Sequence, residues 1–348
     1  MSASKIKYYI FVPMQLLRII AFPFSLIYAL VVYFRNVLYD YDLLAATTFK
    51  TPIVCVGNLS VGGTGKTPMI EWILDHLPAG SKPAVLSRGY KRKTKGFVLA
   101  ELTSTAEEIG DEPLQIYSKF PGLTLAVDAD RTRGIKQLEA SIHPNLILLD
   151  DAYQHRKVKS AFSILLTAYG QLYTKDWYLP TGNLRDSRSS SKRADLIVVT
   201  KCPPDLDLDG QRRISGELNP LKNQKILFCT LEYDTVLKGK KKGLLLTDLK
   251  NKEVTLVTGI ANPEQLIVFL QSKEITFDHL RYRDHHYFSG KEIDFFNSRS
   301  LILTTEKDFM RLKYKVDNLY YIPVRHRFLG DGEEVITKCL EKLGNRFL

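Results

Sequence analysis

A glycine-rich segment near residue 60 has the composition of a loop that binds phosphate. It follows an apolar run at 53–56, precedes a helix-like stretch at 69–77, and reads Gly62-Gly63-Thr64-Gly65-Lys66-Thr67. Glycines let backbone N–H groups turn toward phosphate oxygens, and the amino-terminal end of the following helix adds a positive dipole. Lys66 would reach the β- and γ-phosphates of a nucleoside triphosphate, and the hydroxyl of Thr67 would ligate Mg²⁺.

This segment departs from the strict pattern for such loops, G-x-x-x-x-G-K-[ST], because Ser60 holds the first glycine position and Val61 follows it. The alternative interpretation is a glycine-rich turn with a chance Lys-Thr pair. Strand, glycines, Lys-Thr and helix occur in the order that the motif demands, which favours the phosphate loop. We therefore predict that residues 60–67 bind nucleotide phosphates.

Two adjacent carboxylates supply a second candidate site. Asp150 and Asp151 directly follow the apolar run at 146–149. An apolar strand that ends in Asp can hold Mg²⁺ or its waters beside the phosphates. Successive side chains of an extended backbone point to opposite sides, so one carboxylate would serve the metal and the other a structural role. The sequence leaves open which is which.

The elements that position these residues alternate between strands and helices. Apolar β-rich runs occur at 53–56, 84–87, 123–127, 146–149, 163–166 and 196–199, and helix-like stretches separate most of them. This rhythm predicts an α/β fold whose parallel sheet is covered on both faces. After Pro203 and Pro204 the composition shifts, and the rhythm resumes with runs at 225–233, 244–247, 254–258, 301–304 and 319–323. We predict a membrane-associating segment at 1–45, a P-loop α/β domain at 46–215, and a smaller α/β domain at 216–348 that closes over the active site.

Composition narrows the class of protein. The 348 residues are 45% hydrophobic and 25% charged, which excludes intrinsic disorder and collagen-like structure. The formal net charge of +11 indicates an anionic partner. No stripe of interleaved basic and aromatic residues is present, so we assign this charge to phosphates and a membrane surface and expect no nucleic-acid partner. Four widely spaced cysteines favour neither a disulfide framework nor a zinc site.

The amino-terminal stretch at 8–34 is almost uncharged, with Arg18 as its interruption. Its cleanest part, residues 19–34, is shorter than the ~20 apolar residues of a usual spanning helix, and Pro23 breaks it. Three interpretations compete: a buried core helix, a spanning helix, and a helix that lies in one leaflet. Flanking lysines, arginines and tyrosines suit anionic headgroups and favour the third.

Short segments spread over almost the whole chain, in the same order, resemble the tetraacyldisaccharide 4′-kinases of lipid A biosynthesis. The phosphate loop is similar to that family's own variant, which also lacks the first glycine. The other segments are Ser87-Arg88-Gly89-Tyr90, Gly110-Asp111-Glu112-Pro113, Asp130-Arg131, Asp150-Asp151-Ala152-Tyr153-Gln154-His155, a Pro-Thr-Gly-Asn-Leu-Arg-Asp loop at 180–186, Asp284-His285, and Thr305-Glu306-Lys307-Asp308.

The resemblance implies a kinase that uses ATP and Mg²⁺. Its acceptor would be the 4′-hydroxyl of a tetraacylated glucosamine disaccharide 1-phosphate, the lipid A precursor. It would work at the cytoplasmic face of a Gram-negative inner membrane, beside anionic lipid. The resemblance also implies that Asp111 is the base and pairs with His285 across the two domains. From residues alone, Asp111 before Pro113 is an ordinary start of a helix, and His285 lies in a polar stretch typical of a surface.

Further polar residues lie in predicted loops at the carboxyl ends of strands, where α/β active sites occur. Arg88, Arg131 and Arg185 suit bidentate phosphate contacts, although each is equally compatible with a solvated surface charge. Gln154 and His155 follow Asp151 and are candidates for contacts to sugar hydroxyls, or for ordinary loop capping. We assign all five to acceptor binding.

Two other functions fit part of the pattern. A membrane-associated P-loop ATPase that acts as a switch or partitioning protein would have a similar Gly-Gly-Thr-Gly-Lys-Thr loop. Such proteins carry a lysine early in the loop, where this chain has Ser60 and Val61. A non-catalytic scaffold is disfavoured because Lys66, Thr67, Asp111, Asp150 and His285 are all intact. The sequence does not determine an oligomeric state.

Overall fold

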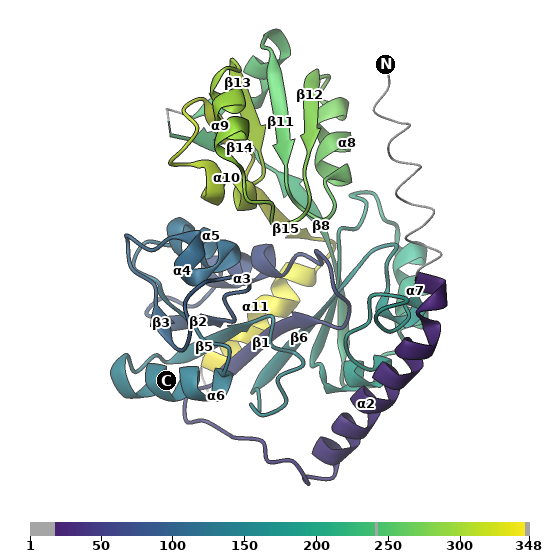
Figure 1. Ribbon diagram of the computed structural model, residues 1–348. Coiled ribbons are helices and arrows are strands. Elements are labelled where there is room, and N and C mark those ends of the chain that lie inside the picture. Colours follow the sequence, from purple (N-terminus) through teal and green to yellow (C-terminus); the bar gives the residue numbers. More distant parts are fainter. Residues whose placement is uncertain (1–17, 241–242, 345–348) are drawn as a thin grey trace.

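The computed structural model describes residues 18–240 and 243–344, and it contains two β-sheets surrounded by helices (Figure 1). The larger sheet is built from β1 (Ile53–Asn58), β2 (Pro83–Ser87), β3 (Val98–Leu99), β4 (Thr124–Val127), β5 (Leu146–Asp150), β6 (Phe162–Ala168), β7 (Leu196–Thr200), β8 (Lys225–Tyr233) and β15 (Val324–Phe328). Its order is β15-β8-β7-β6-β1-β5-β2-β4-β3. The strands from β8 to β4 run parallel, and the edge strands β15 and β3 are antiparallel to their neighbours.

The smaller sheet contains β9 (Val236–Gly239), β10 (Leu244–Leu245), β11 (Val254–Thr258), β12 (Phe277–Arg281), β13 (Leu301–Thr304) and β14 (Leu319–Tyr321). Its order is β10-β9-β14-β13-β11-β12, in which β12, β11, β13 and β14 run parallel. Two α/β units with parallel sheets confirm the predicted fold class. The run predicted as a strand at 244–247 ends after Leu245, where a 3-10 helix, η3 (Leu246–Asn251), begins.

The chain passes between the two sheets twice. It leaves the larger sheet after β8, builds the smaller one, and returns through β15 (Figure 1). The two crossings are paired, because the amide N of Asp234 donates to the carbonyl of Pro323 at 2.9 Å. The predicted domain boundary between residues 215 and 216 does not separate the strands of the larger sheet from those of the smaller one. Strands β8 and β15 lie after that boundary and belong to the larger sheet.

Helices cover both faces of the larger sheet, as its near-continuous apolar strands require. The even-numbered residues of β1, such as Val54, face α3 (Lys66–Asp75), α5 (Asp111–Lys119) and α11 (Gly332–Gly344). The odd-numbered residues, such as Cys55, face α6 (Arg131–Ser141), α7 (Leu208–Leu218) and the long connections after β5 and β6. The remaining short helices are α4 (Ala106–Ile109), η1 (Tyr173–Lys175) and η2 (Arg188–Arg193). Helices α8 (Glu264–Ser272), α9 (Gly290–Asn297) and α10 (Glu306–Leu312) accompany the smaller sheet.

Helix α2 (Phe22–Asp40) lies along one side of the larger unit (Figure 1). It is long and apolar enough to cross a membrane, and only 17% of its apolar window is buried. The interpretation as a buried core helix is therefore wrong. A narrow polar stripe attaches the helix to the protein: Ser25 Oγ donates to Thr181 at 2.8 Å, and Asn36 Nδ2 donates to Asp186 at 2.8 Å. The first part of the predicted apolar stretch, at 8–17, lies outside the described residues.

A buried polar cluster joins three helices from both units. Gln115 of α5 donates to Glu71 of α3 at 2.9 Å and to Glu306 of α10 at 3.1 Å. Lys119 of α5 pairs with the same two carboxylates, at 2.6 and 3.2 Å. Burial and the nearby charge of Glu71 raise the pKa of Glu306 to about 7, against the opposing charge of Lys119. The cluster fixes α10 of the smaller unit against α5 of the larger.

Replacing Glu306 by Gln should flatten the pH dependence of stability. Because the pKa of Glu306 is higher in the folded chain than in the unfolded one, the folded state holds an extra proton between about pH 4 and 7. Stability therefore falls as pH rises through that window. Glu306→Gln, which is always neutral, should be more stable than wild type at pH 8 by on the order of 2 kcal/mol and close to it near pH 4. Thermal melts at both values, with the exposed Glu341→Gln as control, test this; parallel pH slopes in both variants would contradict it.

Candidate active site

The phosphate loop lies between β1 and α3 and is held in shape by its own polar residues. Gly65, which precedes the first residue of α3, has φ of +83°, a conformation that favours glycine. Asn58 Nδ2 donates to Thr64 Oγ1 at 2.9 Å, and Thr200 Oγ1 at the end of β7 donates to the Thr64 carbonyl at 2.8 Å. On the opposite side, the amide of Val61 donates to the carbonyl of Asn183 at 2.7 Å. The loop is thus preformed at the carboxyl edge of the parallel sheet.

Lys66 meets the second residue of the carboxylate pair. Its Nζ lies 3.7 Å from Oδ1 of Asp151 and 3.5 Å from Oδ1 of Asn58. Arg185 also binds Asp151: Nη1 donates to Oδ2 at 3.0 Å, and Nη2 contacts Oδ1 and the Asn58 amide oxygen. Burial opposes ionisation of Asp151, but Lys66 and Arg185 hold the pKa of its carboxyl well below the usual range. Both oxygens of Asp151 are therefore occupied by cations.

Asp150 differs from its neighbour. It is buried at the end of β5, and its Oδ2 accepts from Ser87 Oγ at 2.9 Å, while its buried Oδ1 has no hydrogen-bond partner among the described residues. Burial and the charges of Glu112 and Asp151 raise the pKa of Asp150 to about 6. A buried carboxylate oxygen without a partner, on the strand next to the loop that carries Thr67, fits a Mg²⁺ ligand. The part of the chain described contains no group of three acidic, His or Cys side chains that could hold a metal ion.

Asp111 and His285 are 174 residues apart in the sequence and are hydrogen-bonded in the structure. His285 Nδ1 lies 2.8 Å from Asp111 Oδ2. Asp111 is the first residue of α5, and His285 lies beyond β12 with a left-handed φ of +59°. Burial opposes ionisation of Asp111, but hydrogen bonds from His285 and Arg311 lower its pKa to about 2. The charge of Glu112, the second residue of α5, raises the pKa of Asp150.

Two cationic side chains of α10 contact the Asp111–His285 pair, and the sequence patterns assign a role to neither. Lys307 Nζ donates to His285 Nε2 at 3.0 Å and pairs with Glu112 at 3.1 Å. Arg311 Nη2 contacts Asp111 Oδ2, and its Nη1 lies 3.2 Å from Asp308. Because Nε2 accepts from Lys307, the proton of a neutral His285 is on Nδ1, where it points at Asp111. Lys307 belongs to the segment at 305–308 that carries the family resemblance, and this segment is the sequence signal that points toward it.

The remaining predicted residues are distributed differently. Arg131 is fully buried and donates to the carbonyls of Asp128 at 2.9 Å and Asp150 at 3.3 Å, so it supports the end of β5. Gln154 Nε2 donates to the carbonyl of Asn58 at 2.7 Å, which places it against the phosphate loop. Burial and the charge of Arg131 lower the pKa of His155. Arg88 is exposed after β2.

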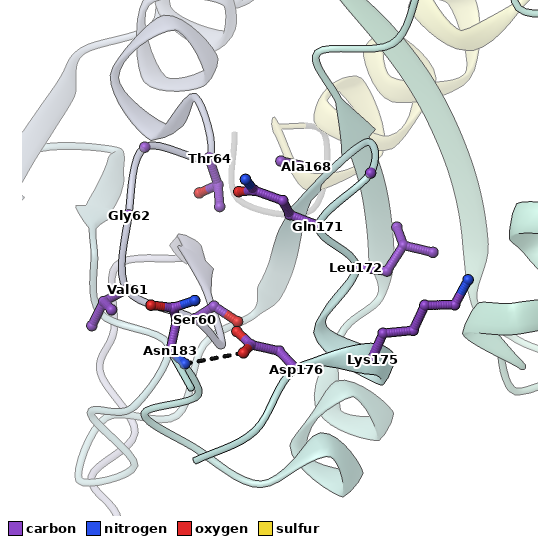
Figure 2. A pocket seen from close by; sticks show the side chains of 12 residues that line it. Ser60, Val61, Gly62, Thr64, Ala168, Gln171, Leu172, Lys175, Asp176 and Asn183 are labelled. Carbon is purple, nitrogen blue, oxygen red and sulfur yellow. Dashed lines mark hydrogen bonds between the residues drawn. The ribbon is translucent and has the colours of Figure 1, made fainter. Parts of the chain in front are cut away.

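A cavity of about 230 Å³ lies beside the phosphate loop (Figure 2). Residues 60–64 form one wall, and the turn after β6 forms another with Gln171 and Leu172. Asp176 reaches toward the loop and accepts from the amide of Asn183 at 3.0 Å. Asp111 and His285 are not among the residues that line this cavity.

The parallel sheet, the glycine-rich loop with Lys66 and Thr67, and Asp150 on the neighbouring strand define a P-loop nucleotide-binding protein with a second α/β unit over the loop's edge. The model of the family described as tetraacyldisaccharide-1-P 4′-kinase matches residues 17–344. The chain belongs to this family.

The chain is also similar to individual members of this family. The chain is 47% identical to a tetraacyldisaccharide 4′-kinase of Flavobacterium johnsoniae, over 94% of this chain and 98% of the relative. It is 38% identical to one of Porphyromonas gingivalis, over 91% and 95%. A crystal structure of LpxK from Aquifex aeolicus in complex with ATP superposes with a TM-score of 0.78 at 28% identity and covers 95% of this chain and 100% of that one.

Substituting Arg311 should shift the acidic limb of the pH–rate profile. Removing its charge lets the pKa of Asp111 rise from about 2 toward the ordinary value of ~4. In Arg311→Met, kcat/KM at pH 4 relative to pH 8 should therefore fall about two-fold more than in wild type, and the acidic limb should move up by about one to two pH units. The exposed Lys315→Met is the matched control. A loss of equal size at every pH would show that Arg311 acts only on structure.

Proposed function

We propose that this chain transfers the γ-phosphoryl group of ATP to the 4′-hydroxyl of a tetraacylated glucosamine disaccharide 1-phosphate in lipid A biosynthesis. Family membership and the relatives' names support this substrate, and the ATP complex of the Aquifex aeolicus structure supports the donor. The observation that carries the proposal is the Asp111–His285 hydrogen bond, which brings together a carboxylate from one unit and an imidazole from the other.

The donor site uses the loop at 60–67. Backbone N–H groups of the loop and the start of α3 surround the β- and γ-phosphates, and Lys66 neutralises charge that develops during transfer. Asp151, which accepts from Arg185 at 3.0 Å, holds Lys66 in place through a contact at 3.7 Å. Thr67 and the free oxygen of Asp150 would hold Mg²⁺, which would supply positive charge to offset that of the phosphates. Asp151 would then act on Lys66 rather than on the metal.

The acceptor site uses Asp111. Its carboxylate, ionised at every physiological pH, accepts a hydrogen bond from the acceptor hydroxyl and takes its proton as the phosphoryl group arrives. His285 fixes the carboxylate through Nδ1, while Lys307 holds Nε2 of the ring from behind. Arg88, His155 and Gln154 are proposed contacts for the acceptor. Arg131 is proposed to support them by holding the end of β5 through the Asp150 carbonyl. The smaller unit is proposed to be closed over the acceptor site in the arrangement described, because the Asp111–His285 hydrogen bond and the buried cluster around Glu306 join it to the larger unit.

Helix α2 is proposed to lie in the headgroup region of the cytoplasmic leaflet of the inner membrane. Its exposed face carries large apolar side chains, among them Phe24, Ile27, Leu30, Val31 and Phe34. Its opposite stripe docks on the loop that contains Arg185, since Tyr28 donates to the Arg185 carbonyl at 3.0 Å. This contact would place the phosphate loop a short distance from the membrane that holds the acceptor.

Transfer of label from γ-labelled ATP to the detergent-solubilised disaccharide, with Mg²⁺, tests the activity. Wild type should label the lipid. Lys66→Ala, Asp111→Ala and His285→Ala should each lose at least about 100-fold, because they remove phosphate charge neutralisation, the base and the group that orients it. Labelling unaffected by Asp111→Ala or His285→Ala would keep the kinase and discard the pair. ATP hydrolysis stimulated by vesicles without any labelled lipid would instead favour the ATPase switch.

Changing the exposed face of α2 tests the membrane proposal separately. The triple variant Phe24→Ser, Leu30→Ser and Phe34→Ser keeps the docking residues Ser25 and Tyr28. It should move the protein from vesicles of anionic lipid to the supernatant in a flotation assay and retain activity on detergent-solubilised acceptor. A Ser substitution of the exposed Leu102, far from α2 in sequence, is the control. Undiminished flotation of the triple variant would place the anchor elsewhere.

A further inference from the structure

Lys201 lies against the phosphate loop and takes no part in the mechanism described so far. It directly follows Thr200, the last residue of β7, and its φ of +61° is uncommon for a residue with a side chain. A Cβ placed on Gly63 would lie 3.9 Å from Lys201 Nζ. The hydrogen bond from Thr200 to the Thr64 carbonyl, at 2.8 Å, fixes this turn to the loop. The ammonium is therefore held beside the glycines of the loop.

The ammonium of Lys201 has no counter-charge among the described residues. Within residues 18–240 and 243–344, no hydrogen bond or ion pair of its Nζ is formed, whereas Lys66 pairs with Asp151 and Lys307 with Glu112. Burial alone lowers the pKa of Lys201. A desolvated cation without a partner is costly, and a strained backbone conformation adds to the cost. A ligand that supplies oxygen acceptors for the ammonium would offset the cost of the buried charge and explain why the backbone holds Lys201 in this position.

The sheet order indicates which part of a ligand would meet Lys201. Asp150 ends β5 on one side of β1, and Lys201 follows β7 on the other side, beyond β6. The terminal phosphate must lie on the β5 side, near Lys66 and the start of α5. The remainder of a nucleotide then extends along the carboxyl edge toward β6 and β7, away from the acceptor. Its ribose and innermost phosphate would come to the turn at Lys201.

We propose that Lys201 is a nucleotide-binding residue whose ammonium donates to the α-phosphate and ribose oxygens of ATP. This inference deepens the proposed function and rests on ATP as its donor. Lys201 would contribute to affinity for the nucleotide and not to the transfer step, because it lies on the far side of the loop from Asp111 and Asp150. The smaller unit reaches the same turn, since Gln265 of α8 donates to the Lys201 carbonyl at 3.3 Å.

The test compares Lys201→Met with Lys201→Arg and with Lys136→Met, an exposed lysine on α6, all in the full chain in detergent. Calorimetric titration with ADP should show binding about ten-fold weaker in Lys201→Met and close to wild type in Lys136→Met. The KM for ATP should rise by about the same factor, with kcat within about two-fold of wild type. Lys201→Arg, which keeps a cationic donor, should recover part of the affinity. Without nucleotide, the melting temperature of Lys201→Met should be equal to or above that of wild type, because an unpaired charge is removed.

Three results would overturn the assignment. Unchanged ADP affinity would exclude contact with the nucleotide. A fall in kcat at unchanged KM would move Lys201 to the reacting phosphate. Equal losses of ADP binding and nucleotide-free stability in both Lys201 variants would make it a structural residue. Titration with ADP needs no acceptor, so a wild-type chain that fails to phosphorylate the disaccharide would refute the proposed function while the role of Lys201 was still measured.

Discussion

The hydrogen bond between His285 Nδ1 and Asp111 Oδ2, at 2.8 Å, depends on the arrangement of both units of the molecule. It requires a loop of the smaller unit and the first turn of α5 in the larger unit to keep their relative position closely. Lys307 and Arg311 of α10 approach the same pair, so one short helix supplies two of its cations. A carboxylate surrounded by donors stays ionised, and an imidazole that accepts at Nε2 keeps its proton toward that carboxylate.

Two structural devices meet this requirement. The chain crosses between the sheets twice, and the crossings are hydrogen-bonded to each other near Asp234 and Pro323. The buried cluster of Glu71, Gln115, Lys119 and Glu306 then locks α10 against α5 and α3. Helix α3 begins at the phosphate loop and α5 begins at Asp111, so the same cluster sets the distance between the proposed donor and acceptor sites. Buried polar groups satisfied in this way specify one arrangement of helices rather than several.

The carboxylate pair and α2 show how local surroundings give similar residues different properties. Asp150 is buried with one free oxygen and a raised pKa, whereas Asp151 binds two cations and has a lowered pKa. Opposite directions of neighbouring side chains produce this division. The side chains of α2 also point in different directions and meet different surroundings. A polar stripe of Ser25, Tyr28 and Asn36 holds the loop around Arg185, and the apolar remainder faces outward.

The sequence by itself determined the local elements. The apolar runs beginning at 53, 84, 146 and 196 became β1, β2, β5 and β7, and the glycine-Lys-Thr pattern became a loop before a helix, because these depend on hydrophobic period and backbone freedom. The family resemblance also paired Asp111 with His285. Only the tertiary structure decided that β8 and β15 join the larger sheet, that α2 is largely exposed, and that Arg131 is buried under β5. It alone placed Arg311 on Asp111 and Lys201 beside Gly63. Such contacts join residues far apart in the chain, and no periodicity or spacing encodes which cation meets which carboxylate.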